Sequence, residues 1–157
     1  MFESTGKLIY DPHARIKQAP NWLILRTDEE ILRYYQHWIK KELALDLGGI
    51  RRAPIKFETT VWGSHISVHR GTTIPNQHLW KKHQGENIKF TYSNRVYHIN
   101  NWFFCVDAYS ERLEEIRTEL GLSKTPPYGF HVTIGRVNKQ YLTSLLPANA
   151  KLDIKSI

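Results

Sequence analysis

The sequence predicts a single α+β domain in which helices pack on the outer side of a curved antiparallel sheet. The chain has 157 residues, which is the length of one domain with a hydrophobic core, so we assign residues 1–157 to one unit. Apolar residues make up 41% and charged residues 24%, as in globular proteins. The expected elements follow the order strand, helix, strands, helix, strand. Each half then contains one long helix and one strand that carries a histidine, which suggests two similar halves.

The first half is expected to contain three strands and one helix. Apolar runs predict strands at residues 7–10 and 21–27, separated by a turn-rich link with two prolines. Asp28 is a typical N-cap residue, and Glu29 and Glu30 fall in the first helical turn, where the helix dipole favours acidic groups. This helix should stop at the glycines 48–49, after an apolar stripe formed by Ile31, Tyr34, Tyr35, Trp38, Ile39 and Leu43. A third strand is expected at residues 59–71.

The second half begins with the polar residues 72–85, which we expect to form a loop or a short helix. Residues 86–93 and 96–108 are predicted as paired strands that turn at residues 93–94. Ser110 is expected to cap a second helix, which has an apolar face and ends at a glycine: Leu113, Ile116, Leu120 and Gly121. A strand at residues 130–137, a short helix from residue 138 and an edge strand at residues 151–157 complete the prediction.

The chain carries 22 Lys and Arg against 15 Asp and Glu, a net charge of +7. This charge favours an anionic partner such as a nucleotide or nucleic acid, although a basic protein without a charged ligand is an alternative. No long basic run indicates a tail that binds a DNA duplex. The single cysteine, Cys105, excludes an internal disulfide. We expect a soluble, cytoplasmic protein without a membrane partner, because neither a signal peptide nor a long apolar run is present, and a homo-oligomer is compatible with the sequence.

Two motifs carry the expected chemistry: HIS at residues 65–67, within WGSHISVHRG, and HVT at residues 131–133, within FHVTIGRV. Side chains alternate between the faces of a strand, so His65 and Ser67 share one face, as do His131 and Thr133, with a spacing of roughly 6.6 Å. Two such strands side by side would surround one phosphate with two imidazoles and two hydroxyls. One neutral histidine can remove a proton, one protonated histidine can donate one, and the hydroxyls can bind the phosphate oxygens. This chemistry needs no metal and no cofactor.

Two other readings of the motifs stay open. A single such motif is most often a solvated sheet face, and only the pair strengthens the catalytic reading. His65 and His69 could also suggest a metal site, but four residues along a strand span about 13 Å, too far for ready chelation of one ion. Gly63 and the β-branched residues of this stretch argue against the helix that would bring those two histidines together.

The paired motifs resemble those of the two-histidine (2H) phosphoesterase superfamily, whose members have a two-lobed, pseudo-symmetric α+β fold with antiparallel sheets lining a central cleft. Within it, the stretches MFESTGKLIYDP, WGSHISVHRG and YGFHVTIGR are similar to the anti-CBASS nucleases of tailed phages. The resemblance implies cleavage of 3′–5′ bonds in cyclic di- and trinucleotide messengers of bacterial antiphage defence. The catalytic histidines would be His65 and His131, and the phosphate-binding hydroxyls Ser67 and Thr133. Ser67 stands where many relatives have Thr, which keeps the hydroxyl.

The substrate's bases and phosphates need aromatic and cationic partners. Tyr128, Trp80 and Tyr10 are the candidate base-stacking residues, while Arg70 and Arg136 end the two histidine strands and could steer a phosphate. Trp62 is expected in the core, because alternation places it opposite His65. Further candidates with weaker support are His69 as a pocket wall, Arg51 and Arg52 in the basic loop, and Trp102; Trp22 and Trp38 are expected in the core.

Two alternative functions compete with the messenger-cleaving enzyme. One is an RNA-end enzyme of the same superfamily, which opens 2′,3′-cyclic phosphates or ligates RNA. The other is a non-catalytic binder that sequesters nucleotides. Retention of both histidines and both hydroxyls speaks against the second alternative. The sequence does not decide which histidine is the base and which the acid.

Overall fold

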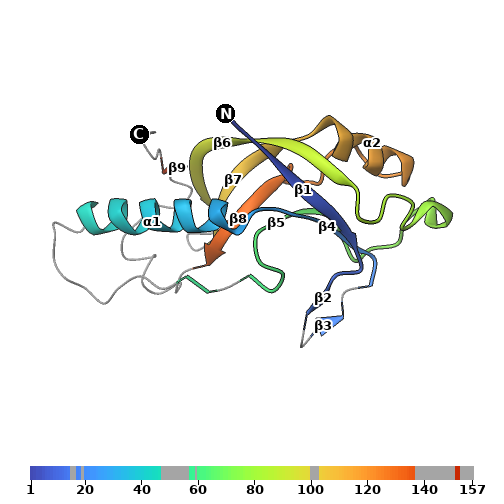
Figure 1. Ribbon diagram of the computed structural model, residues 1–157, viewed down its shortest axis with the longest axis horizontal. Coiled ribbons are helices and arrows are strands. Elements are labelled where there is room, and N and C mark those ends of the chain that lie inside the picture. The colour runs from blue at the N-terminus through green and yellow to red at the C-terminus, as the bar shows by residue number, and fades with distance from the viewer. Residues whose placement is uncertain are drawn as a thin grey trace.

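The computed structural model describes residues 1–14, 17–18, 20–46, 57–58, 60–99, 103–136 and 151–152. It is an α+β structure, as predicted, with an antiparallel sheet and two α-helices (Figure 1). A short 3₁₀ helix, Gln77–Leu79, follows β5. The elements in chain order are β1 (Phe2–Tyr10), β2 (His13–Ala14), β3 (Lys17–Gln18), β4 (Trp22–Arg26), α1 (Glu29–Asp46), β5 (His65–Arg70), β6 (Asn87–Ile99), β7 (Phe103–Tyr109), α2 (Glu111–Glu119), β8 (His131–Arg136) and β9 (Lys151–Leu152).

The main sheet has the strand order β1-β4-β5-β8-β7-β6-β9, and all of these pairings between described strands are antiparallel. Strand β1 also pairs with β6, so β1, β4, β5, β8, β7 and β6 form a closed circuit of pairings. The strand changes partners near Gly6, where a Cβ atom would lie 2.6 Å from Leu25 Cγ and 2.7 Å from the Arg26 carbonyl oxygen. Glycine is needed there because the backbones approach too closely for a side chain.

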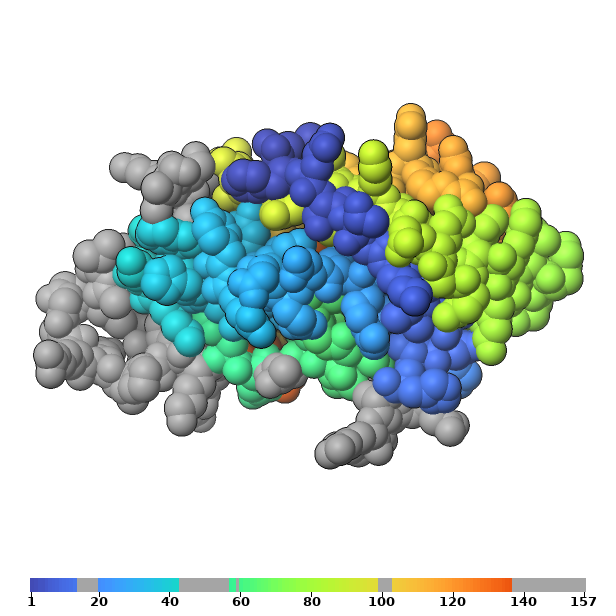
Figure 2. All heavy atoms as spheres, in the orientation of Figure 1, coloured from blue at the N-terminus to red at the C-terminus, as the bar shows by residue number. Residues whose placement is uncertain are grey.

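The hydrophobic core joins one face of the sheet to both helices. Ile66 of β5 and Val132 of β8 are fully buried, in one cluster with residues of α1 and α2 such as Tyr35 and Ile116. Alternation along the strands therefore leaves His65 and His131 on the opposite face. Figure 1 shows α1 and α2 at different ends of the molecule, and in Figure 2 atoms of β1 and of the first part of α1 lie on the face in view.

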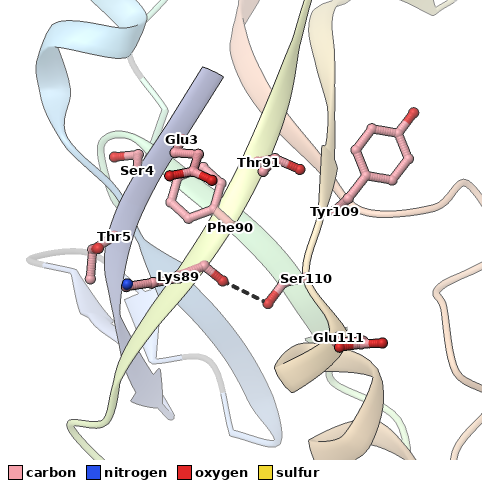
Figure 3. Close-up of a pocket in the computed structure, with 9 residues that line it drawn as sticks. All are labelled: Glu3, Ser4, Thr5, Lys89, Phe90, Thr91, Tyr109, Ser110 and Glu111. Carbon is pink, nitrogen blue, oxygen red and sulfur yellow. Dashed lines mark hydrogen bonds between the residues drawn. The ribbon is translucent and has the colours of Figure 1, made fainter. Parts of the chain in front are cut away.

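The ends of the two helices follow the sequence in all but one respect. Asp28 caps α1 as predicted, since its Oδ1 accepts a hydrogen bond from the Glu30 N–H at 2.9 Å. Ser110 occupies the N-cap position of α2, as predicted, but its hydroxyl forms no capping hydrogen bond. That hydroxyl instead donates to the Lys89 carbonyl at 2.9 Å, which ties the start of α2 to β6 (Figure 3). Gly121 ends this helix with a φ of 81°, and the predicted apolar face of Leu113, Ile116 and Leu120 is buried.

Two strand predictions need correction. Residues 61–64 form turns and bends, so β5 begins only at His65, although residues 59–71 were expected to be extended. The predicted turn at Ser93 and Asn94 is absent, because β6 continues through both residues and only its register with β7 shifts there. Tyr35 donates its hydroxyl hydrogen to the Ser93 carbonyl at 2.8 Å, so a helix supports this irregular part of the strand.

Several expectations lie outside the described residues. They are the helix stop at residues 48–49, the basic loop with Arg51 and Arg52, Trp102, and the short helix after residue 138. Of the expected edge strand, Lys151 and Leu152 pair with β6 as β9. Within the described part of the chain, no helix is both long and apolar enough to span a membrane.

Candidate active site

The two histidine strands are neighbours at the centre of the sheet. β5 and β8 run antiparallel, with Ile66 opposite Val132. The side-by-side arrangement expected from the motifs is therefore present. His65 and His131 are 8% and 8% exposed, and Ser67 and Thr133 are half-buried. Two imidazoles and two hydroxyls thus lie on the same face of adjacent strands.

Both histidines are held by a glycine two residues earlier in the chain. His65 Nδ1 lies 2.8 Å from the Gly63 carbonyl oxygen, and His131 Nδ1 lies 3.3 Å from that of Gly129. A carbonyl can only accept, so Nδ1 of each ring carries the proton, and Nε2 of the neutral ring can accept one. The glycines have φ values of 71° and 68°, a left-handed conformation that other residues rarely adopt. A glycine two residues before each histidine is visible in the sequence, but the sequence analysis did not use it to predict the site.

Each histidine strand contains a β-bulge at the equivalent position. The register between β4 and β5 shifts so that Val68 has no partner, and the register between β7 and β8 shifts so that Ile134 has none. The carbonyls of these two residues accept side-chain hydrogen bonds from the helices. Arg117 Nη1 of α2 donates to Val68 O at 2.5 Å, and Gln36 Nε2 of α1 donates to Ile134 O at 2.9 Å. The helices therefore fix the strands just beyond the motif residues.

The electrostatic surroundings lower the pKa of both histidines. Burial is the main cause for His65 and for His131, because it disfavours the charged imidazolium. The positive charge of Arg70 lowers both pKa values further. The Gly63 and Gly129 carbonyls act in the opposite direction. A bound phosphodiester would add a negative charge here and favour the protonated form of a histidine.

Two cavities meet at the motif residues. The first, which we call the Tyr128 cavity, has a volume of about 370 Å³ and is lined by His131, Tyr128 and the prolines 126–127. The second, the Trp62 cavity, has a volume of about 260 Å³ and is lined by His65, Thr133 and Trp62. Ser67 and Arg70 line both. A phosphate bound at the junction would have room for a group on either side.

The predicted phosphate-steering arginines differ in their surroundings. Arg70 is exposed, and no carboxylate forms an ion pair with it among the described residues. Arg136 lines the Trp62 cavity but forms an ion pair with Glu58, with Nε 2.6 Å from the carboxylate oxygen. Arg70 is thus the better placed of the two to bind a phosphate.

Of the three predicted base-stacking residues, the structure brings only Tyr128 to the motifs. This residue is 75% exposed and lines the Tyr128 cavity. Tyr10 is buried in the core at 4% exposure, and Trp80 packs edge-on against it at 4.7 Å, with its indole nitrogen 3.1 Å from Asp11 Oδ2. Neither Tyr10 nor Trp80 lines the Tyr128 cavity or the Trp62 cavity, although the Trp80 ring lies 6.3 Å from that of His69, which lines the Tyr128 cavity. Their role as base-stacking residues stays a prediction.

Four further residues lie at the site, and the sequence predicted the surroundings of some of them but not of all. Trp62 is buried as expected, but it lies in a turn, so alternation does not apply, and its ring is 5.6 Å from that of His65. Trp22, expected in the core, is half-buried and lines the Trp62 cavity. His69 lines the Tyr128 cavity, in line with the expectation of a pocket wall. Glu58 was missed, because its isolated bridge to Arg136 is a long-range contact.

A larger hollow of about 470 Å³ lies between β1, β6 and the start of α2, and Figure 3 shows its lining residues. It contains Ser110 and Lys89 and none of the predicted site residues. In the described part of the chain, no three His, Cys, Asp or Glu side chains are grouped as ligands of a metal ion. Comparisons of the chain with models of protein families, with curated proteins and with solved structures find no match.

Proposed function

We propose that this protein is a metal-independent phosphodiesterase that cleaves 3′–5′ bonds of cyclic di- or trinucleotides. The observation that carries the proposal is the junction of the two cavities. There, two histidines with Nδ1 held by carbonyls lie on adjacent strands, beside two hydroxyls and an arginine without an ion-pair partner among the described residues. These are the groups that acid–base cleavage of a phosphodiester requires.

A two-lobed, pseudo-symmetric 2H fold is part of this proposal, and the element order supports it. β1, β4, α1 and β5 form one half, and β6, β7, α2 and β8 repeat the order in the other. The glycine–histidine contacts, the bulges and the helix-to-bulge hydrogen bonds occur in both halves. The hydrogen bonds also cross between halves, since α2 binds β5 and α1 binds β8.

In the proposed reaction, the ribose 2′-hydroxyl attacks the adjacent phosphorus while the bond from phosphorus to the 5′-oxygen breaks. One histidine accepts the 2′-hydroxyl proton at Nε2, and the other donates a proton to the departing 5′-oxygen. Ser67, Thr133 and Arg70 stabilise the non-bridging oxygens as negative charge builds there. The products are a 2′,3′-cyclic phosphate and a free 5′-hydroxyl.

The choice of cyclic oligonucleotides as substrates rests on the resemblance to phage anti-CBASS nucleases and is supported by the two cavities. Cavities on both sides of the phosphate site suit two nucleosides joined by one phosphodiester. Cleavage of such messengers in the cytoplasm of an infected bacterium would remove the signal of the host's antiphage defence.

The test is incubation of the protein with cyclic dinucleotides, cyclic trinucleotides and 2′,3′-cyclic mononucleotides in EDTA, with products read by mass spectrometry. We expect the cyclic oligonucleotides to be linearised, and a 2′-deoxyribose at the scissile linkage to block cleavage. His131→Ala should bind the substrate without turnover. Hydrolysis of mononucleotides alone would indicate an RNA-end enzyme. Binding without turnover by the parent protein would indicate a sequestering protein.

A further inference from the structure

The two halves of the site differ in the charge that lies beside each histidine. In the sheet register, His65 is directly opposite Arg26 of β4, and His131 is directly opposite Asp107 of β7. Directly opposed side chains on antiparallel strands are about 4.5–5.5 Å apart at their Cβ atoms, which is close enough for charges to interact. The equivalent positions therefore hold a cation in one half and an anion in the other.

These neighbours act in opposite directions on the two rings. Besides burial, Arg70, His131 and Arg26 all lower the pKa of His65, while the Gly63 carbonyl raises it. For His131, Arg70 lowers the pKa while Asp107 raises it. Arg70 acts on both rings and does not distinguish them. The proton that the pair must carry for acid–base chemistry is thus favoured on His131 and disfavoured on His65.

Each histidine also belongs to a different cavity. His65 lines the Trp62 cavity with Trp22 and Trp62, whereas His131 lines the Tyr128 cavity. A base that takes the 2′-hydroxyl proton must lie beside the nucleoside that carries this hydroxyl. An acid that protonates the 5′-oxygen must lie beside the leaving nucleoside. The identity of the base therefore determines the direction in which the substrate crosses the site.

Resting on the proposed phosphodiesterase function, we infer that His65 is the general base and His131 the general acid, and that the substrate is oriented accordingly. The nucleoside with the attacking 2′-hydroxyl occupies the Trp62 cavity, and the leaving nucleoside occupies the Tyr128 cavity. His65 Nε2 takes the 2′-hydroxyl proton, and His131 Nε2 gives its proton to the 5′-oxygen. Arg26 and Asp107 are positioning residues, because they act through the histidines and not on the substrate.

A substrate with sulfur in place of the bridging 5′-oxygen tests the roles directly, since a thiolate leaves without a general acid. On the ordinary oxygen substrate, His65→Ala and His131→Ala should each lose about 10²–10⁴-fold in rate. On the sulfur substrate, His131→Ala should recover most of that loss and His65→Ala should not. Recovery by His65→Ala, by both variants or by neither would overturn the assignment. If an alanine variant does not fold, as judged by circular dichroism, the asparagine variant replaces it.

The pH profile of kcat/KM offers a second test through the isosteric or near-isosteric variants Asp107→Asn and Arg26→Gln. Asp107→Asn should lower the pKa of His131, and with it the alkaline limb. Arg26→Gln should raise the pKa of His65, and with it the acidic limb. Both variants should therefore narrow the bell-shaped profile. In the proposed roles both variants should also lower the maximum of kcat/KM, because fewer molecules then carry the proton on His131 alone. With the roles reversed the profile would narrow in the same way but its maximum would rise, and an unchanged profile would remove Arg26 and Asp107 from the mechanism.

The orientation can be tested by NMR with the parent protein and two probes. 2′-Deoxyadenosine 3′-phosphate carries its phosphate as the attacking nucleoside does, and adenosine 5′-phosphate as the leaving nucleoside does. The first probe should shift the indole N–H signals of Trp22 and Trp62 more than the second, with Trp80 as an internal control. The opposite preference would overturn the orientation. Failure of the parent protein to cleave any oligonucleotide would instead overturn the proposed function itself.

Discussion

Replacing Arg70 by methionine should weaken catalysis at the junction of the two cavities. Arg70 lines both cavities and has no ion-pair partner among the described residues, so its guanidinium is available to a phosphate. A hydrogen bond to a charged group contributes about 1.5–3 kcal/mol. At 1.4 kcal/mol per tenfold, Arg70→Met should lower kcat/KM for a cyclic dinucleotide by about 10- to 150-fold. The pH optimum should also rise, because Arg70 lowers the pKa of both His65 and His131.

Arg136→Met is the matched control, since Arg136 ends the equivalent strand but is paired with Glu58. We expect it to lower kcat/KM by less than Arg70→Met and to leave the pH optimum in place. The assay is steady-state cleavage across pH 5–9, with folding checked by circular dichroism. Equal losses for the two variants, or an unchanged pH optimum in Arg70→Met, would show that Arg70 does not act on the phosphate and the histidines as argued.

Two further predictions concern stability. Arg117→Met should lower the free energy of unfolding by about 1–3 kcal/mol in urea titrations, because the buried Val68 carbonyl loses its donor. Arg112→Met on the same helix, whose ion pairs are half-exposed, should cost less, about 1 kcal/mol at most. Equal costs for the two variants would contradict this account. His98 is 5% exposed, both ring nitrogens lack a hydrogen-bond partner among the described residues, and burial lowers its pKa. Below the ordinary histidine pKa of about 6.5, His98 binds a proton in the unfolded chain but resists protonation in the native state, so stability should fall with decreasing pH. We therefore expect His98→Phe to show a smaller drop in melting temperature between pH 8 and pH 5 than the parent protein. An equal drop in the two proteins would refute this role of His98.

Local patterns were sufficient for most elements of the fold and for the shared face of the four motif residues, His65, Ser67, His131 and Thr133. Alternation correctly separated Ile66 and Val132, which are core residues, from His65 and His131 on the other face. The prediction of a turn at Ser93 failed because turn-forming residues also occur within long strands, where a tertiary contact supports them. Here that contact comes from a helix tyrosine 58 positions away in the chain.

The surroundings of the motifs could not be predicted in the same way, because they depend on strand register. A bulge is a property of two paired strands, and the donor that satisfies its carbonyl lies 49 positions away for Val68 and 98 for Ile134. Tyr10 shows the same limit, since its place near the end of a strand suggested the site, while packing against Trp80 put it in the core.

The repeat between the halves extends further than the two motifs. Glycine, histidine, hydroxyl and arginine recur as Gly63, His65, Ser67 and Arg70, then 66 positions later as Gly129, His131, Thr133 and Arg136. A perfectly repeated site would bind a phosphodiester in either direction, but the proposed reaction requires a base on one side and an acid on the other. The asymmetry must therefore come from residues outside the repeat. The Glu58 partner of Arg136 and the opposed charges of Arg26 and Asp107 supply such differences, and all three depend on cross-strand pairing.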